Sequence, residues 1–378
     1  GIINIFEYQN LAIALAAPTG RAAKRMSEVT GMEAKTIHRL LEVEWDEDDK
    51  PYFRRNIENP LDCNALILDE LSMIDIHLFA HLLEALPLGC RLILVGDSDQ
   101  LPPVGSGNVL HDLILSEKLP VVCLTQVFRQ ALESKIITNA HKIVSGENPD
   151  LANDGKDFFH MERPNPYLSA QTVVSLCSER LPNAYGWDAF SDIQVICPSK
   201  KGETGTQNLN RLLQGALNPP DKDKGEITIA GQVFRTGDKI MQVKNNYNIE
   251  WESKADKGRG IFNGDIGVIK TIDPQMETLT VVYDDREADY TFEQLSELEP
   301  AYAMTVHKSQ GSEYRCVILS AWSGSAYLLN RGILYAAITR AKELLVIAGR
   351  EEVVATMTEN AKVGKRYSGL KLRLQGKV

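Results

Sequence analysis

The sequence lacks the features that would assign it to several common classes of protein. It has no uninterrupted apolar run long enough to cross a membrane, and its first residues do not show the basic-then-apolar pattern of a secretory signal. Its six cysteines are scattered, with no CxxC pair and no histidine at zinc-ligand spacing. A disulfide framework and a zinc module are therefore excluded, and a cytoplasmic protein with reduced thiols and no membrane association is expected.

Positive charge is also scarce. The formal net charge is -10, whereas proteins that coat nucleic acid indiscriminately usually carry a positive field. Acidic residues cluster in 42–49 and again in 284–299, which leaves other faces neutral or basic. Any contact with nucleic acid is therefore expected in a local groove.

What the sequence does contain is the rhythm of an α/β protein with two lobes. Its 378 residues, 43% of them apolar, are enough for two packed cores. Short apolar runs of the kind found in buried parallel strands lie at 11–17, 65–68, 92–95, near 121 and at 193–197. Helical patterns lie at 21–29, 76–86 and 134–144. Strands that alternate with helices in this way are typical of doubly wound parallel sheets.

A segment of different character interrupts the second lobe. Short β-rich runs alternate with turn residues at 227–229, 239–243, 267–272 and 278–283. Asn263-Gly264 is a strong signal for a tight turn, and Asp284-Asp285 is a weaker one. The α/β pattern then resumes with strands at 317–320 and 344–348 and a helix at 330–341. We therefore predict a first lobe at 1–120, a second lobe at 121–224 and 300–378, and a small β-barrel inserted at 225–299.

Two neighbouring strands end in polar residues suited to nucleotide hydrolysis. Asp69 and Glu70 follow the run ALIL, and Gln100 lies just beyond the next strand. Ligands of open α/β sheets collect at the carboxyl ends of the strands. Asp69 would hold Mg²⁺ through its water shell, and Glu70 would polarise an attacking water. Gln100 would sense either a γ-phosphate or that water. The alternative is a strand that ends in an ordinary polar turn, followed by a proline-rich connection.

These two segments resemble motifs II and III of superfamily 1 helicases, and further motifs follow in order. Segments resembling motif Ia, the next DNA-contacting motif and motifs IV, V and VI lie at 16–26, 35–41, 124–130, 303–313 and 334–345. With a barrel inserted ahead of VHKSQGSE, the chain most resembles the RecD-like branch. This resemblance implies two RecA-like P-loop NTPase lobes, each a parallel sheet flanked by helices, and an SH3-like barrel. It also implies ATP-driven 5′-to-3′ movement on single-stranded DNA and at duplex junctions, in DNA repair or recombination.

The resemblance gives individual residues expected roles. Arg129 and Arg340 would reach the γ-phosphate from the second lobe. Glu313 would bind the nucleotide ribose, and Gly311 would let the backbone turn closely there. DNA phosphates or sugars would be held by Thr19, Arg21, Thr36, His38, Pro103, Thr305, His307 and Lys308. The alternatives are an ordinary helix-surface position for Arg340 and a structural role for the two histidines. The sequence indicates no particular protein partner.

Residues 43–60 are predicted to form a β-hairpin. It resembles the pin with which RecD-like helicases split DNA strands, and an exposed acidic loop without a function is the alternative.

One motif of the family is missing. The chain has no GxxxxGK[ST] segment, the loop that cradles nucleotide phosphates. Family members carry it directly ahead of a helix that resembles IINIFEYQN, so we expect it to precede Gly1. Without it, tight ATP binding should fail, and these residues alone are expected to hydrolyse ATP negligibly. A non-hydrolysing DNA-binding or scaffold subunit of a repair complex is the alternative function. The retained Glu70, Gln100, Arg129 and Arg340 argue against it.

Overall fold

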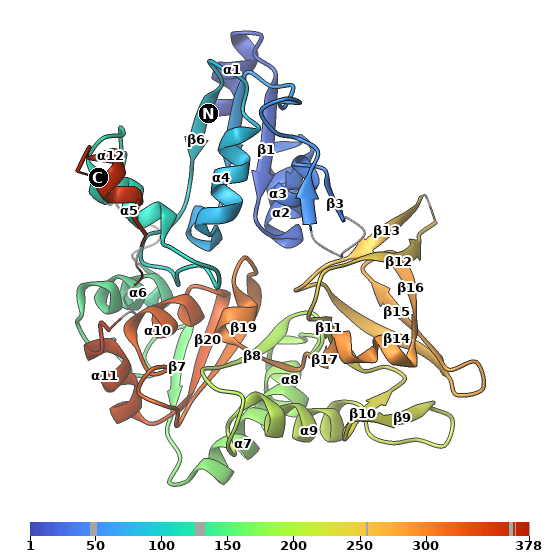
Figure 1. The fold of residues 1–378 in the computed structure, drawn as a ribbon. Coiled ribbons are helices and arrows are strands. Elements are labelled where there is room, and N and C mark those ends of the chain that lie inside the picture. The colour runs from blue at the N-terminus through green and yellow to red at the C-terminus, as the bar shows by residue number, and fades with distance from the viewer. Residues whose placement is uncertain (46–50, 125–132, 255, 363–365, 367, 378) are drawn as a thin grey trace. The chain divides into compact units, whose positions relative to one another are not determined.

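The chain divides into two compact units (Figure 1). The computed structural model describes residues 1–45, 51–124, 133–254, 256–362, 366 and 368–377. Unit 1 consists of Gly1–Gln126 and Val363–Val378, and unit 2 of Val127–Lys362. In the part of the chain that is described, no helix is both long and apolar enough to cross a membrane.

Unit 1 is built on a parallel sheet with the strand order β2-β1-β5-β6. Its strands are β1 Ile13–Ala17, β2 Ala34–Thr36, β5 Ala65–Leu68 and β6 Arg91–Leu94. Its helices are α1 Ile2–Tyr8, α2 Gly20–Thr30, α3 Ile37–Leu40, α4 Ile76–Glu84, α5 Val109–Ser116 and α12 Leu370–Leu374. A separate antiparallel pair is formed by β3 Val43–Trp45 and β4 Pro51–Phe53. The strand β5 is buried along its whole length, whereas β6, at one end of the sheet, is only partly buried.

The last helix of the chain belongs to unit 1. The helix α12 packs on α5, and its Leu370 and Leu374 side chains contact the unit 1 core. The Arg366 guanidinium donates to the carbonyl oxygens of Gly105 and Gly107. The prediction that all of 300–378 lies in the second lobe is therefore wrong beyond Lys362. Two leucines one turn apart give the tail an apolar face, and this face is covered by α5.

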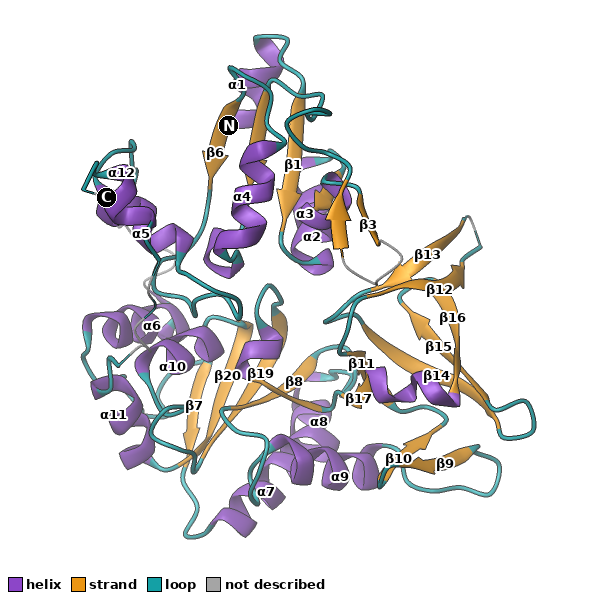
Figure 2. Cartoon of the chain, viewed as in Figure 1, coloured by secondary structure: helices purple, strands orange, loops and turns teal. Residues whose placement is uncertain are grey.

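Unit 2 contains a five-stranded parallel sheet with the order β18-β8-β19-β20-β7 (Figure 2). Its strands are β7 Phe158–Met161, β8 Ile193–Cys197, β18 Ala303–Thr305, β19 Tyr314–Ala321 and β20 Ala341–Gly349. The helices of this unit are α6 Lys135–Ser145, α7 Pro166–Ser175, α8 Leu181–Tyr185, α9 Thr206–Leu217, α10 Arg331–Ile338 and α11 Glu351–Glu359. The apolar run predicted to form a strand near residue 121 has no strand structure in 121–124, the part of it that the structure describes. A short apolar run alone does not make a strand without a neighbour to bond.

The inserted segment forms a curled antiparallel sheet with the order β13-β12-β16-β15-β14-β11-β17. Its strands are β11 Lys239–Gln242, β12 Asn246–Glu252, β13 Lys257–Ile261, β14 Ile266–Asp273, β15 Thr278–Tyr283, β16 Arg286–Thr291 and β17 Leu298–Pro300. A two-stranded sheet of β9 Glu226–Ile229 and β10 Gln232–Arg235 precedes it. Both predicted turns are present: Asp284-Asp285 links the paired residues Tyr283 and Arg286, and Gly264 takes a φ of 97°. This φ favours glycine because it has no Cβ.

Candidate functional site

The carboxyl ends of the parallel strands in unit 1 carry most of the site residues predicted for that lobe. Ala17 of β1 lies beside Thr36 of β2, and Leu68 of β5 lies between Ala16 of β1 and Leu94 of β6. The residues that follow these strand ends therefore lie along one edge of the sheet. They are Thr19 after β1, Asp69 and Glu70 after β5 and Gln100 beyond β6, and Thr36 is itself the last residue of β2.

The backbone at Asp69 and Glu70 is unusual. Glu70 has φ 53° and ψ 42°, a left-handed conformation that is uncommon for a residue with a side chain. One Asp69 carboxylate oxygen accepts the Glu70 N–H at 2.8 Å, and the next amide, that of Leu71, bonds to the Val95 carbonyl at 3.0 Å. Among the described residues, the second Asp69 oxygen accepts no hydrogen bond, so it can face a hydrated cation. Backbone strain of this kind is concentrated at functional sites.

Gln100 lies in a loop that is fixed at several points. Its backbone N–H donates to the Asp97 carbonyl at 3.4 Å, and its half-buried side-chain amide bonds to none of the described residues. Pro103, further along, is buried. The Ser106 carbonyl accepts the N–H of Ile76, the first residue of α4. Gln100 thus lies in the loop that follows β6, and its side-chain amide has no partner among the described residues.

The predicted DNA-binding threonines of unit 1 are helix caps. Thr19 accepts the Ala22 N–H at 3.2 Å at the start of α2, and Thr36 accepts the Arg39 N–H at 3.3 Å at the start of α3. An accepting hydroxyl keeps its own hydrogen and can still donate it to a phosphate. Arg21 lies in the first turn of α2. A cap and a phosphate contact are therefore compatible at these positions.

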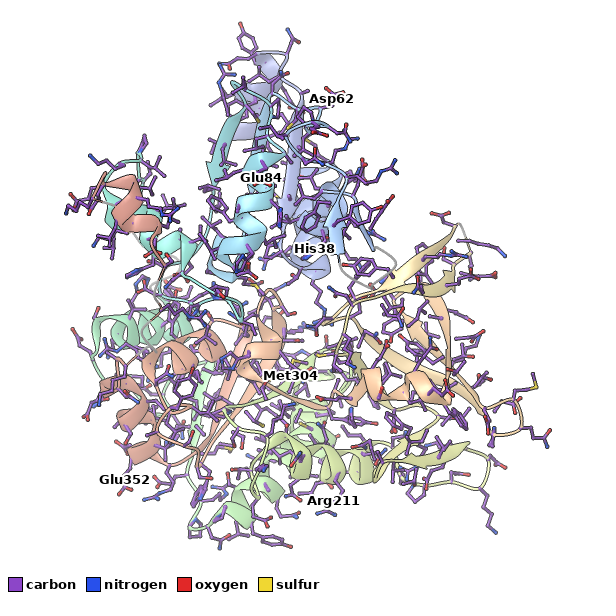
Figure 3. The ribbon with its side chains drawn as sticks, in the orientation of Figure 1. His38, Asp62, Glu84, Arg211, Met304 and Glu352 are labelled. Atoms are coloured by element: carbon purple, nitrogen blue, oxygen red, sulfur yellow. The ribbon has the colours of Figure 1, made fainter. Side chains whose placement is uncertain are left out.

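His38 lies on α3 and is labelled in Figure 3. Burial lowers the pKa of His38, and the charge of Asp75 only partly opposes this. Its ring centroid is 6.1 Å from that of Phe53 on β4, and Phe53 lies 5.0 Å from His81 of α4. Within the predicted hairpin, β3 and β4 pair antiparallel and Phe53 packs on the unit 1 core, while residues 46–50 lie outside the described residues.

In unit 2 the predicted residues separate into two groups at opposite edges of the sheet. Gly311 and Glu313 precede β19, and Arg340 immediately precedes β20, so these three lie at the amino edge. Thr305 ends β18, and His307 and Lys308 follow it, at the carboxyl edge. Arg129 lies outside the described residues, and its role stays a prediction.

Arg340 is buried, with only 5% of its surface exposed. Its guanidinium donates to the carbonyls of Ala336 and Ser312, each at 3.1 Å, and to the Thr339 hydroxyl at 3.3 Å. No carboxylate among the described residues forms an ion pair with it. A buried cation held only by neutral acceptors retains its full attraction for an anion. The helix-surface alternative for Arg340 is wrong, because the side chain is enclosed.

The other amino-edge residues lie close to Arg340. Gly311 takes a φ of 70°, and Glu313 forms an ion pair with Lys342 at 3.5 Å. The Tyr314 N–H bonds to the Arg340 carbonyl at 2.8 Å, which ties the start of β19 to the start of β20. The structure therefore brings together the segments that resemble motifs V and VI.

The carboxyl edge contains two charged residues that the sequence did not single out. Lys200 follows β8, and Glu299 lies on β17 of the curled sheet. Glu299 bonds to Lys308 at 2.8 Å and lies 3.4 Å from Lys200. The lysine pair in PSKKGE, directly after an apolar strand, is a signal that could have pointed to Lys200. The pairing of Glu299 could not be read from the sequence, because about a hundred residues separate the two strands.

Comparisons with known proteins agree with this architecture. Sequence models of three families match in chain order: an AAA domain at residues 1–106, the SH3 domain of ATP-dependent RecD-like DNA helicases at 209–283, and a UvrD-like helicase C-terminal domain at 300–348. In fold, the chain is similar to a crystal structure of Bacteroides Pif1 bound to single-stranded DNA, with a TM-score of 0.50 at 18% identity. That likeness covers 93% of this chain and 86% of the other.

Two curated relatives are similar over most of the chain. The ATP-dependent RecD2 DNA helicase of Deinococcus radiodurans is 37% identical over 349 residues, which cover 92% of this chain and 44% of the relative. The RecBCD enzyme subunit RecD of Mycobacterium tuberculosis is 31% identical over 394 residues, which cover 96% and 64%. The chain thus spans less than two thirds of either relative. By its domains and these likenesses, the chain belongs to the RecD-like family of superfamily 1 helicases.

Proposed function

We propose that this chain forms the motor of an ATP-dependent DNA helicase that moves 5′ to 3′ along single-stranded DNA in repair or recombination. The observation that carries the proposal is the edge of the unit 1 sheet. Two adjacent parallel strands lead to this edge. Beyond their carboxyl ends lie Glu70 in its left-handed conformation, Asp69 with one carboxylate oxygen free of hydrogen bonds to the described residues, and the side-chain amide of Gln100. The direction of movement rests on the family alone.

The residues at this edge fit a nucleotide with Mg²⁺. Bound Mg²⁺ would neutralise phosphate charge, and the open Asp69 oxygen would hold it through its water shell. Glu70 would accept a proton from the attacking water, and Gln100 would orient that water. Arg340 would stabilise the charge that develops on the departing phosphoryl group, for which a permanently charged planar donor is well suited. Arg129 would assist it, as the family likeness implies.

DNA would be gripped by hydroxyls and few cations. Thr19 and Thr36 keep a donor hydrogen while capping helices, and Thr305 ends a parallel strand in unit 2. Neutral donors of this kind hold a sugar-phosphate backbone without reading its sequence. This agrees with the net charge of -10, which disfavours a broad cationic surface.

The test uses a longer form of the protein that carries a phosphate-binding loop. Glu70→Gln should abolish DNA-stimulated ATP turnover and unwinding while single-stranded DNA binding is unchanged, because only the proton acceptor is lost. The wild type should unwind duplexes with a 5′ tail and not those with a 3′ tail. Normal unwinding by the variant would show that Glu70 has been assigned wrongly, and unwinding of 3′-tailed duplexes would reverse the proposed direction.

The ATP turnover of the 378-residue chain alone is compared with that of the longer form. The 378-residue chain contains no GxxxxGK[ST] segment, so its ATP turnover should be negligible beside that of the longer form. If the longer form also fails to hydrolyse ATP but binds DNA, the scaffold function replaces the motor.

A further inference from the structure

A small pocket opens where the curled sheet joins the parallel sheet of unit 2. Its empty volume, including space open to solvent, is about 280 Å³. Its lining includes Met241 of β11 and Met304 of β18, the second of which is labelled in Figure 3. Thr206 and Asn210 of α9 and Thr305 of β18 line it with polar groups. The pocket therefore lies beside a residue predicted to bind DNA.

The charged lining consists of two cations and one anion. Lys200 reaches the pocket from the end of β8 and Lys308 from the segment after β18. Both pair with Glu299, at 3.4 Å and 2.8 Å, so the single carboxylate offsets one of the two positive charges. Burial alone would raise the pKa of Glu299, but its hydrogen bonds and charge interactions with the two lysines lower it below its usual range. Glu299 is thus an anion bound by a two-lysine site.

The backbone around this site is rigid, whereas the ion pairs are accessible. The Asn210 side chain donates to the carbonyls of Pro300 and Ala303 and accepts the Ala303 N–H, which fixes the link between β17 and β18. The exposed fractions of the side chains are 52% for Lys200, 45% for Glu299 and 23% for Lys308. The exposed pair with Lys200 contributes little to stability, so the cost of displacing Glu299 lies mainly in its pair with Lys308. A phosphate oxygen can then take its place without movement of the main chain.

We propose that Lys200 and Lys308 form a site for one backbone phosphate of single-stranded DNA, and that Glu299 occupies this site until the phosphate displaces it. The proposal rests on the function proposed above. In an acidic protein, an internal competitor of this kind lowers the affinity for stray anions, while a DNA strand held at neighbouring positions displaces it. The two lysines would release the DNA strand readily during movement, because their ion pairs with Glu299 form again as the phosphate leaves.

The test measures how the affinity of the described chain for a labelled oligothymidylate changes with salt concentration. Glu299→Gln should bind several-fold more tightly than wild type, and the slope of log K against log salt should steepen by about 0.7, the value for one phosphate neutralised on a single strand. Lys200→Gln should bind more weakly with a shallower slope. Glu287→Gln is the matched control, because Glu287 pairs with Lys270 at 2.7 Å and its side chain is 46% exposed.

The outcomes separate the two proposals. If Glu299→Gln binds no more tightly than Glu287→Gln, or if Lys200→Gln does not weaken binding, the phosphate site is refuted. A loss of affinity in Thr305→Ala would in that case leave the proposed function standing. If the wild-type chain does not bind the oligothymidylate, both proposals fail.

Free phosphate is the other source of the same chemistry. Inorganic phosphate is therefore added at the ionic strength of a chloride control, and melting temperatures are compared. Stabilisation of the wild type and not of Lys200→Gln, without any effect of Glu299→Gln on DNA affinity, would assign the pocket to free phosphate and overturn the DNA assignment. A phosphate effect no larger than that of chloride, with the expected DNA affinities, supports it.

Discussion

At the scale of single residues, Glu70 combines a carboxylate at the end of a strand with a backbone conformation that is unfavourable for any residue with a side chain. A side chain in the left-handed region brings its Cβ close to the following carbonyl oxygen, at a cost of roughly 1–2 kcal/mol. Glu70 takes this conformation directly after β5, with its backbone held by Asp69 and the next amide by Val95. Glycine would relieve the strain but would carry no carboxylate. Six other described non-glycine residues, among them Glu42, Glu117 and Glu277, also take a positive φ, so this conformation is one that tight turns of the chain adopt and does not by itself mark a catalytic position.

This argument predicts an unusual order of stability. Glu70→Gly should have a free energy of unfolding about 1 kcal/mol higher than Glu70→Ala, because only alanine keeps a Cβ in the left-handed region. Denaturant unfolding of the two variants gives the difference directly. Arg25, exposed in the middle of α2, is the control. There the order should invert, with glycine about 1 kcal/mol below alanine, as expected in a helix. The same order at both positions would show that the strain at Glu70 is not real.

Arg340 illustrates what a motif does and does not reveal. The segment LYAAITRAKELL predicts a role for Arg340, but it does not predict which groups surround its side chain. The structure adds that its guanidinium is enclosed and held by carbonyls from α10 and from the segment before β19. Such burial arises from contacts between segments distant in sequence, so periodicity could not have predicted it.

At the scale of elements, strands buried in the sheets were predicted best. The runs at 65–68 and 193–197 coincide with β5 and β8, and the runs at 317–320 and 344–348 lie within β19 and β20. Such strands are continuously apolar because helices or strands cover both faces. The three-residue strands β2 and β18 were missed, since their residues are ordinary and only their neighbours make them strands.

The site followed the same division. The place of Asp69 and Glu70 directly after β5 could be predicted, because the order of the sequence fixes which residues follow a parallel strand. Their roles and that of Gln100, which lies further beyond β6, stay predictions. The Glu299 pairing with Lys200 and Lys308 was not predicted. It depends on how the curled sheet returns to β18, which is a matter of tertiary packing.

The helix α12 gives a prediction at this scale. Leu374 packs against the unit 1 core near α5, whereas Leu372, two residues earlier, is 44% exposed. Leu374→Asp should destabilise α5 by about 1–3 kcal/mol, because an apolar contact is lost and a charge faces the core. Leu372→Asp should change stability by less than about 0.5 kcal/mol. Hydrogen exchange of the α5 amides measures both effects. Equal protection of α5 in the two variants would show that α12 does not stabilise unit 1.

At the scale of the whole molecule, the two units have cores that share no residue. One core contains Leu82 and the other Leu213, and each of these side chains is fully buried. A chain of this length exceeds the size at which single cores stop growing, so separate cores are expected. The chain crosses between the units near residue 126 and again near 362, which joins them without merging their cores.

Separate cores should unfold separately. Leu82→Ala should lower the stability of unit 1 by about 2–5 kcal/mol, and Leu213→Ala should do the same for unit 2, because each leaves a cavity in one core. Hydrogen exchange resolved by peptide, followed as denaturant is raised, reports the two units in one experiment. The expected result is loss of protection in the unit that carries the substitution, with the other within about 0.5 kcal/mol of wild type. Equal loss in both units from either substitution would mean that they fold as one cooperative body.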